Sequence, residues 1–195
     1  MSDLRKAVSD ELLVRYASPT LAALKVGNLI SYRYRDTQAV VEQVATWNRM
    51  LNDKGVAITL LSSKDELHLL YVHRPHLLDD KMKDEEVQTL LCPLGYPIGS
   101  CPHLLKHLQE RLDSQKEQTF PHEIGLFLGY PTQDVKAFIQ NQGCRGLCDG
   151  CWKVYNDVDT AKRIFAQYKH CTKVYLELHH KGWSIERLTV QRKAL

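Results

Sequence analysis

The sequence predicts an α+β fold, with a small, mostly antiparallel sheet and helices concentrated in the C-terminal half. Two apolar segments, 56–61 and 67–73, are separated by a short polar turn and are expected to pair as an antiparallel hairpin. After Pro75, apolar residues recur at the three- and four-residue spacing of helices. The 195 residues are expected to form a single domain, 1–195, with an N-terminal α/β part at about 1–75 and a helical part at about 76–195.

In the N-terminal part, each predicted element has its own local pattern. Ser18 and Pro19 predict the start of a short helix, because serine caps helices and proline fits a first turn. Gly27 is expected to end that helix. The other predicted elements are helices at 3–15 and 37–52 and strands at 29–34, 56–61 and 67–73.

The C-terminal part is predicted to be helical except for one short strand. A long stretch of apolar residues at helical spacing ends at Gly182, which is expected to break the helix. The predicted elements are helices at 76–82, 84–91, 101–112, 121–128, 132–142 and 157–180, a last helix from Ile185, and a strand at 152–155.

The composition predicts a soluble globular protein, since 44% of the residues are hydrophobic. No apolar segment approaches about 18 residues, so no membrane-spanning helix is expected. The start, MSDLRKAVSDELL, is charged and lacks the apolar centre of a signal peptide, which predicts a cytoplasmic location. In that reducing compartment the six cysteines are expected to be free, metal-bound or catalytic.

The net charge of +3 is too small to indicate a nucleic-acid partner. The positive charge is concentrated at 161–195, where eight Lys and Arg residues face two Glu residues, which gives 8 − 2 = +6. We interpret this segment as a solvated basic helix face.

Three cysteines in a glycine-rich loop form the leading candidate site. Cys144, Cys148 and Cys151 have Cys-x3-Cys-x2-Cys spacing, and Cys171 is a candidate fourth ligand. Thiolates this close on a bendable loop can bind zinc or an iron–sulfur cluster, so the leading hypothesis is a metal-binding accessory or redox-related protein. Two alternatives stay open: a dithiol redox pair of Cys148 and Cys151, and a surface loop with free thiols.

The helices predicted within 121–142 support a different class of function. Their apolar residues follow the packing pattern of a helix–turn–helix motif. The second helix carries only Lys136, offset by Asp134, which argues against nucleic acid because phosphate contacts supply most of the affinity. The competing hypothesis is a non-enzymatic module that binds an unknown protein partner through this helix pair, with DNA binding as its weaker form.

No set of residues predicts a reaction type, so a non-enzymatic role is favoured. His122 and Glu123 do not continue into a zinc-protease motif, because the residue four positions after His122 is Leu126. We expect structural roles for both, with support of the metal site as the alternative. Lys25 beside Gly27 predicts a helix stop, with anion binding as its alternative.

Three blocks of the sequence resemble a known family. The central block is PHEIGLFLGYP at 121–131, followed by DV at 134–135 and WKVY at 152–155. The flanking blocks are SPTLA at 18–22 with GNL at 27–29, and YKHCT at 168–172. Together they resemble an uncharacterised bacterial family defined as a domain of unknown function, which implies no established activity. The motif residues, to which the resemblance assigns no role, are His122, Glu123, Gly129, Tyr130, Trp152, Lys153 and Tyr155.

The chain departs from the pattern of this family at two positions. The family often has cysteine where this chain has Tyr16, and usually an aromatic residue where this chain has Cys151. A site that requires Cys151 would therefore not be general to the family.

Overall fold

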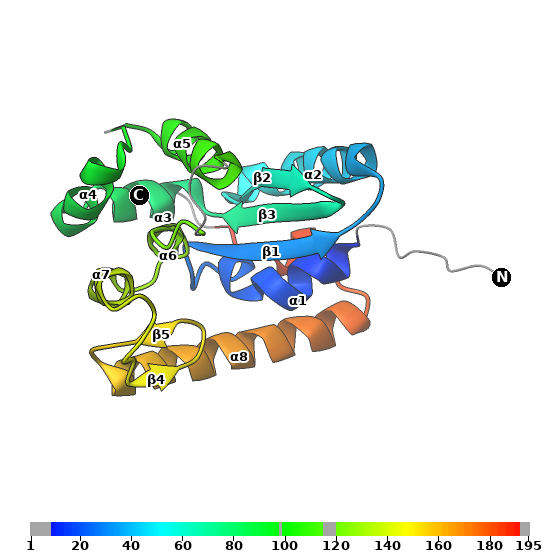
Figure 1. Ribbon diagram of the computed structural model, residues 1–195. Helices are drawn as coiled ribbons and strands as arrows, with labels where there is room; N and C mark the ends of the chain where they lie inside the picture. Colours follow the sequence, from blue (N-terminus) through cyan, green and yellow to red (C-terminus); the bar gives the residue numbers. More distant parts are fainter. Residues whose placement is uncertain (1–8, 98, 115–119, 192–195) are drawn as a thin grey trace.

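The computed structural model describes residues 9–97, 99–114 and 120–191, and it confirms the α+β class (Figure 1). Residues 3–8 of the first predicted helix and the two basic residues at 192–193 lie outside these ranges. The elements in chain order are α1 (Asp10–Leu21), β1 (Gly27–Arg33), α2 (Thr37–Leu51), the 3₁₀ turn η1 (Asn52–Lys54), β2 (Ala57–Lys64), β3 (Leu67–His73), α3 (Pro75–Met82), α4 (Glu85–Leu91), the 3₁₀ turn η2 (Cys92–Leu94), α5 (Cys101–Asp113), α6 (Ile124–Phe127), α7 (Thr132–Gln140), β4 (Cys148–Asp149), β5 (Lys153–Val154), α8 (Val158–His180) and α9 (Ile185–Leu188).

The main sheet is antiparallel, with β3 in the centre between β1 and β2. The predicted hairpin of β2 and β3 is confirmed. Its turn residues Asp65 and Glu66 have φ angles of 49° and 64°, the left-handed conformation that a two-residue hairpin turn requires. The sheet register runs from Gly27 opposite His73 to Arg33 opposite Leu67.

Helices cover both faces of this sheet, and alternate residues of β3 serve the two sides. Leu70 and Val72 pack in a buried cluster with residues of α1 and α2. Tyr71 packs in a second cluster with residues of α3 to α7, and its hydroxyl donates a hydrogen bond to the carbonyl of Phe127. This double burial explains why β3 is apolar at successive positions.

The prediction of a helix start at Ser18 and Pro19 is wrong. Both residues lie in the last turn of α1, which continues to Leu21. The Ser18 hydroxyl donates to the carbonyl of Val14 in the preceding turn and caps no new helix. The whole turn is buried, so tertiary packing overrides the local preference of these residues.

The prediction that Gly27 ends a helix is wrong, because Gly27 is the first residue of β1. A Cβ atom at this position would lie 2.5 Å from a ring atom of Tyr71. The glycine is therefore required for the close approach of β1 to the central strand.

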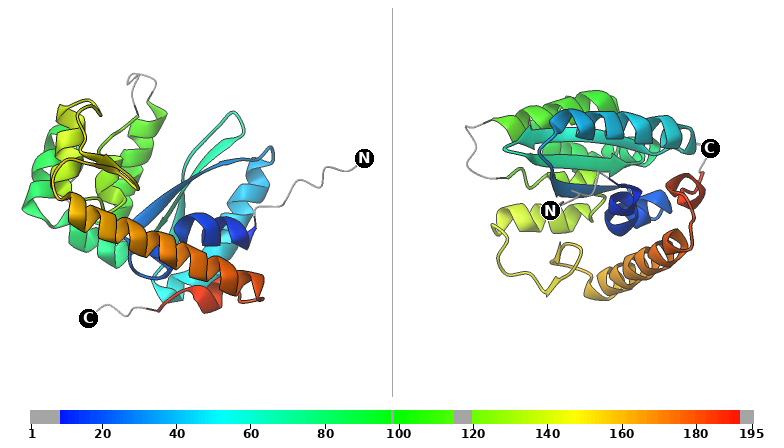
Figure 2. Two further views of the ribbon diagram at one scale, coloured as in Figure 1. Left: turned by 90° about the horizontal axis from the view of Figure 1, so that it is seen from below. Right: turned by 90° about the vertical axis from the view of Figure 1, so that its right-hand side faces the viewer.

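The helix α8 lies beside α1 along one side of the molecule (Figure 2). A small hairpin precedes it, in which Cys148 of β4 pairs with Val154 of β5. The sequence predicts only the second of these strands, because the first is too short to show an alternating pattern. The hairpin lies between α7 and the start of α8, which places the cysteine loop beside the predicted helix pair (Figure 1).

A buried arginine connects segments that are distant in the sequence. Arg74 donates hydrogen bonds to the carbonyls of Thr20 and Leu21 at the end of α1, of Lys54 in η1, and of Val190 after α9. Arg74 thereby ties the end of β3 to the far end of the chain.

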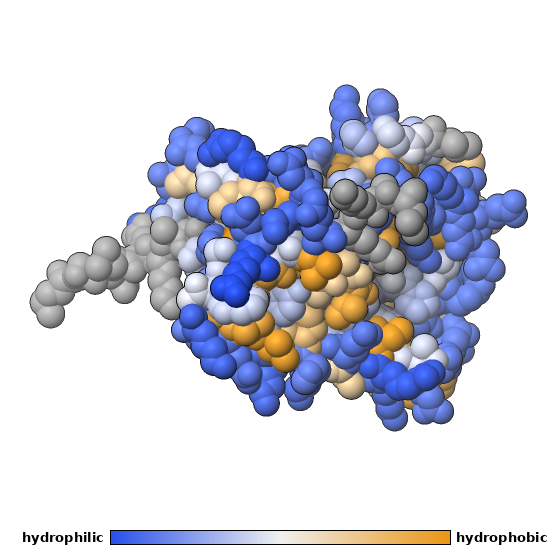
Figure 3. Space-filling view, turned by 180° about the vertical axis from the view of Figure 1, so that it is seen from behind, coloured by the Kyte–Doolittle hydropathy of each residue, from blue (hydrophilic) through white to orange (hydrophobic). Residues whose placement is uncertain are grey.

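The surface is mainly hydrophilic, and apolar side chains gather near the middle of the face seen from behind (Figure 3). Exposed large apolar side chains also occur elsewhere, among them Tyr16 on α1, Phe120 before α6 and Leu147 before β4. Among the helices in the described ranges, none is long and apolar enough to cross a membrane.

Candidate functional site

The structure places the four predicted metal ligands in different surroundings. Cys144 is exposed after α7, Cys148 is half-buried on β4, and Cys151 is exposed between β4 and β5. Cys171 is buried in the middle of α8. Within the described ranges, no group of three or more His, Cys, Asp or Glu side chains is positioned to hold a metal ion. The thiolate metal site stays a prediction, and these residues offer it no preformed ligand set.

Burial works against ionisation of two of these thiols. It raises the pKa of Cys171 to about 11. Although Cys151 is exposed as a residue, partial desolvation of its thiol by neighbouring atoms also raises its pKa, an effect that the Lys25 ammonium partly offsets. Lys153, whose charge is close enough to favour a thiolate on this loop, forms an ion pair with Asp149 at 2.9 Å. Because zinc and iron bind the thiolate form, a metal would have to overcome this cost.

The glycines of the loop are explained by close packing. A Cβ atom at Gly150 would lie 2.0 Å from the ring of Phe165, and one at Gly146 would lie 2.5 Å from the side chain of Lys153. The hairpin can therefore lie directly on α8 because Gly150 lacks a side chain, and Gly146 allows the loop before β4 to pack closely on β5.

A buried carboxylate organises this region. Asp134, at the start of α7, accepts hydrogen bonds from the indole N–H of Trp152 at 2.8 Å and the backbone N–H of Tyr155 at 2.9 Å. It also accepts from the backbone N–H and the side-chain amide of Asn156. Four donors satisfy the buried charge and fix the end of the hairpin against α7.

Beside Asp134, the same segments enclose a pocket of about 200 Å³, which we call the aromatic pocket. The rings of Tyr130 and Trp152 lie 5.2 Å apart, and those of His122 and Phe138 lie 5.0 Å apart. The lining residues are Phe120, His122, Ile124, Gly125, Tyr130, Asp134, Val135, Phe138, Trp152 and Lys153. Four of the seven family-motif residues, His122, Tyr130, Trp152 and Lys153, therefore meet in one place.

Tyr130 also contacts a buried lysine. Lys25 is 7% exposed, and its Nζ atom lies 5.2 Å from the ring centre of Tyr130 and 5.8 Å from that of Tyr168. No carboxylate of the described residues pairs with it. Burial lowers the pKa of Lys25 to about 8, and a nearby Cys151 thiolate acts in the opposite direction. Cation–π contacts take the place of an ion pair here.

Lys25 connects the three blocks of the family resemblance. It lies between the two parts of the first block, while Tyr130 belongs to the central block and Tyr168 to the third. The helix stop predicted at Lys25 does not account for this burial.

The remaining motif residues have structural contacts. Buried Glu123 accepts hydrogen bonds from Arg111 at 2.6 Å and from the Tyr96 hydroxyl at 3.0 Å, so it forms no contact with the cysteine loop. Gly129 has a φ angle of 75°, and a Cβ atom there would lie 2.7 Å from Val26. These contacts fix the turn between α6 and α7 in position.

Two central residues of this region were given other roles by the sequence. Asp134 is predicted there only as the charge that offsets Lys136, and Lys25 only as a helix stop or an anion contact. The position of Asp134 directly before the apolar Val135, on the buried side of α7, is the signal that could have indicated a structural role. The contacts of Lys25 could not be inferred, because they join residues 105 or more positions apart, as in 130 − 25 = 105.

Comparison with known proteins gives one match. Residues 13–189 match the model of a family described as a protein of unknown function, DUF3793. No curated protein and no solved structure matches the chain. The match covers nearly all of the chain and confirms the resemblance of the three sequence blocks. The chain therefore belongs to the DUF3793 family of proteins of unknown function.

Proposed function

We propose that the protein is a non-enzymatic interaction module whose aromatic pocket accepts an apolar side chain from an acidic segment of a partner protein. The observation that carries this proposal is the pocket itself, an apolar cavity built by the 121–142 helix pair and the hairpin. Its position supports the interaction function that is predicted from the sequence as the alternative to metal binding.

The size of the aromatic pocket favours a single side chain as its occupant. At about 200 Å³ it is smaller than the roughly 300–1,000 Å³ typical of small-molecule sites. Interfaces commonly concentrate their binding energy where one anchor side chain enters an aromatic-lined pocket. Trp152 and Phe138 supply such walls, and the hydrogen bond of Trp152 to Asp134 holds the indole in place.

The surroundings of the aromatic pocket favour an apolar and acidic partner. Phe120, Ile139 and Leu147 are exposed on the segments that form it. The charged residues of 132–155 that are not buried are exposed Lys136, Arg145 and Asp149 and half-buried Lys153, which gives 3 − 1 = +2. Charge complementarity would then select and orient an acidic segment.

DNA binding has less support, because α7 is poorly suited to contact bases or phosphates. The side-chain amide of Gln133 donates to both carboxylate oxygens of Glu86 at 3.0 Å. This contact occupies a base-reading group. Lys136 is the only basic residue on α7.

Selection from a random displayed-peptide library, followed by calorimetry with the selected peptides, tests this proposal. We expect acidic peptides with one aromatic or leucine anchor to be enriched. Phe120→Asp should weaken their binding at least roughly tenfold, because the new carboxylate repels an acidic peptide and an apolar wall of the pocket is lost. Tyr16→Asp on α1 is the matched control, since Phe120 and Tyr16 are 49% and 52% exposed.

The proposal fails if no peptide class is enriched, or if both variants weaken binding equally. Binding of duplex DNA that Lys136→Ala abolishes would instead support the helix–turn–helix function.

A further inference from the structure

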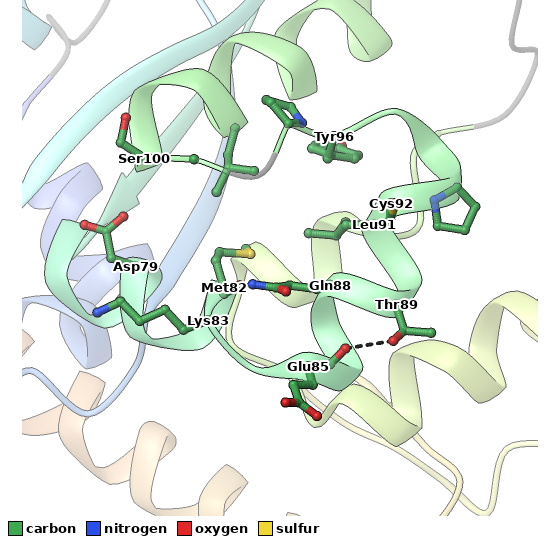
Figure 4. Close-up of a pocket in the computed structure, with 14 residues that line it drawn as sticks. Asp79, Met82, Lys83, Glu85, Gln88, Thr89, Leu91, Cys92, Tyr96 and Ser100 are labelled. Carbon is green, nitrogen blue, oxygen red and sulfur yellow. Dashed lines mark hydrogen bonds between the residues drawn. The ribbon is translucent and has the colours of Figure 1, made fainter.

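A second and larger cavity lies away from the aromatic pocket, with no lining residue in common. It has a volume of about 900 Å³ and is lined by residues of α3, α4 and η2, by Tyr96, Pro97, Gly99 and Ser100, and by Leu104 of α5 (Figure 4). This volume lies within the range of small-molecule sites. Nothing in the family resemblance or in the proposed function assigns a role to it.

The walls of this cavity are apolar and largely fixed. Met82, Leu91, Tyr96 and Leu104 line it and are themselves buried. Tyr96 is held by the hydrogen bond of its hydroxyl to Glu123 and by an edge contact with His107 at 4.5 Å between ring centres. Met82 adds a flexible, polarisable side chain that can adapt to a ligand.

One carboxylate is positioned at the edge of this apolar space. Asp79 lines the cavity from α3, and its Oδ1 atom accepts the backbone N–H of Cys101 at 3.1 Å. That bond fixes the carboxylate and leaves its second oxygen with no partner among the described residues. Lys83 does not neutralise it, because Lys83 pairs with Asp80 at 3.0 Å.

Two polar side chains of the lining are already hydrogen-bonded, the Ser100 hydroxyl with His103 at 3.1 Å and the Gln88 amide to the carbonyl of Met82 at 3.4 Å. Ser100 lies across from Asp79 at the start of α5, and the amide of Gln88 lies beside Met82 (Figure 4). Glu85 also borders the cavity, but its carboxylate points away from it in the same view. Of the two acidic residues that line the cavity, Asp79 is therefore the one whose carboxylate is not directed away from it.

We propose that this cavity binds a small amphiphilic amine, with its apolar body against Met82, Leu91, Tyr96 and Leu104 and its ammonium group on Asp79. An ammonium group donates hydrogen bonds and supplies the positive counter-charge that the Asp79 carboxylate lacks. The apolar body contributes affinity through burial, and the single carboxylate determines orientation and selects cations. This site is independent of the aromatic pocket.

Calorimetric titration with three probes of the same shape tests the inference. The probes are 4-phenylbutylamine, 4-phenylbutanol and 4-phenylbutyrate. We expect the amine to bind at least roughly tenfold more tightly than the alcohol, and the acid to bind most weakly. Asp79→Asn should remove the preference for the amine and leave the affinity for the alcohol unchanged. The asparagine oxygen can still accept the N–H of Cys101, so the fold should be kept.

Glu85→Gln is the matched control, because it removes the same charge from a side chain directed away from the cavity. It should change the affinity for the amine less than about twofold. Gln88→Phe, at a half-buried position on the wall, should narrow the cavity beside Met82 and weaken binding of both the amine and the alcohol. Its thermal unfolding shows whether the fold is kept.

The inference is overturned if the three probes bind alike, or if none binds at millimolar concentration. Equal effects of Asp79→Asn and Glu85→Gln would also overturn it, since a general surface charge would then explain the selectivity. If the Asp79→Asn variant does not fold, the Gln88→Phe variant decides the question. A folded Gln88→Phe protein that binds the amine as tightly as the wild type would contradict the site.

Discussion

At the scale of single residues, Asp134 shows how one side chain determines the shape of the candidate site. Its buried carboxylate accepts four hydrogen bonds from Trp152, Tyr155 and Asn156. Trp152 lies in the turn of the hairpin and Tyr155 and Asn156 follow β5, whereas Asp134 belongs to α7. The aromatic pocket between them therefore depends on a single charge.

We expect Asp134→Ala to lower the free energy of unfolding by about 3 kcal/mol, because hydrogen bonds to a charged group are lost and buried donors are left without partners. Denaturant unfolding measures this change. Asp149→Ala is the control, since Asp149 forms a surface ion pair with Lys153 and should cost less than about 1 kcal/mol. Equal losses for both variants would contradict a special role for Asp134.

A second residue-scale prediction concerns His73 and pH. The imidazole is buried at the end of β3, stacks on Tyr71 with ring centres 4.6 Å apart, and leaves its Nδ1 atom without a partner among the described residues. Burial lowers the pKa of His73 from 6.5 to about 4. The folded state binds the His73 proton less tightly than the unfolded state does. The contribution of neutral His73 to the unfolding free energy is therefore complete above pH 6.5 and is lost as pH falls towards 4.

This loss should amount to roughly 3 kcal/mol between pH 7 and pH 4. It is measured as the difference in unfolding free energy between the wild type and His73→Phe at each pH, which removes the contribution of other titrating groups. The exposed residue His180 provides the control, and His180→Asn should keep the wild-type slope. A His73 pKa near 6.5 in an NMR titration would refute the prediction.

At the scale of elements, the β4–β5 hairpin is held by contacts that leave no room for side chains. Gly150 lies against Phe165 of α8, where a Cβ atom would come within 2.0 Å of the ring. The two strands are two residues each, so their own ladder supplies little stability. Packing on α7 and α8 therefore determines whether the hairpin forms.

Gly150→Ala should separate the hairpin from α8 and lower the unfolding free energy by about 2 kcal/mol through overpacking. Proteolysis under native conditions should then cut within 143–152 faster than in the wild type. Gly99→Ala is the comparison, since a Cβ atom there would meet nothing closer than His103 at 4.0 Å. Unchanged proteolysis and stability in Gly150→Ala would mean that the hairpin does not depend on this contact.

At the scale of the whole molecule, Arg74 joins the end of α1, η1 and the segment after α9 through backbone carbonyls. Arg74→Met keeps the side-chain stem and removes the donors, so buried carbonyls lose their partners. We expect a loss of about 3 kcal/mol in unfolding free energy. Arg35→Met should change stability by less than about 1 kcal/mol, because Arg35 forms an exposed pair with Glu66. Similar values for both arginines would argue against this connecting role.

The metal hypothesis is tested by analysis of the intact, purified protein. Zinc, iron and sulfide content, with an absorption spectrum, should be measured on protein purified anaerobically without a histidine tag. Stoichiometric metal that Cys148→Ala removes would support the thiolate site and would require the loop to rearrange around it. A folded, colourless protein without metal would leave the cysteines as free thiols.

The limits of prediction differ between the elements and the site. The patterns of 37–52 and 67–73 predict α2 and β3 within one residue, because each has a regular apolar face and a clear end. The start of the chain is predicted less well, since burial of the turn at Ser18 and Pro19 outweighs their local preferences. Cysteine spacing limits the distance between thiols along the chain and does not determine the direction in which each sulfur points.

The α+β class, the antiparallel hairpin, most helix positions and membership of the family can be predicted from the sequence, because they follow from local periodicity and motif identity. The structure was needed to show that Lys25 contacts Tyr130 and Tyr168, that Asp134 binds Trp152, and that Cys171 is buried in α8. These contacts join elements far apart in the chain, and their geometry follows from how the whole core packs.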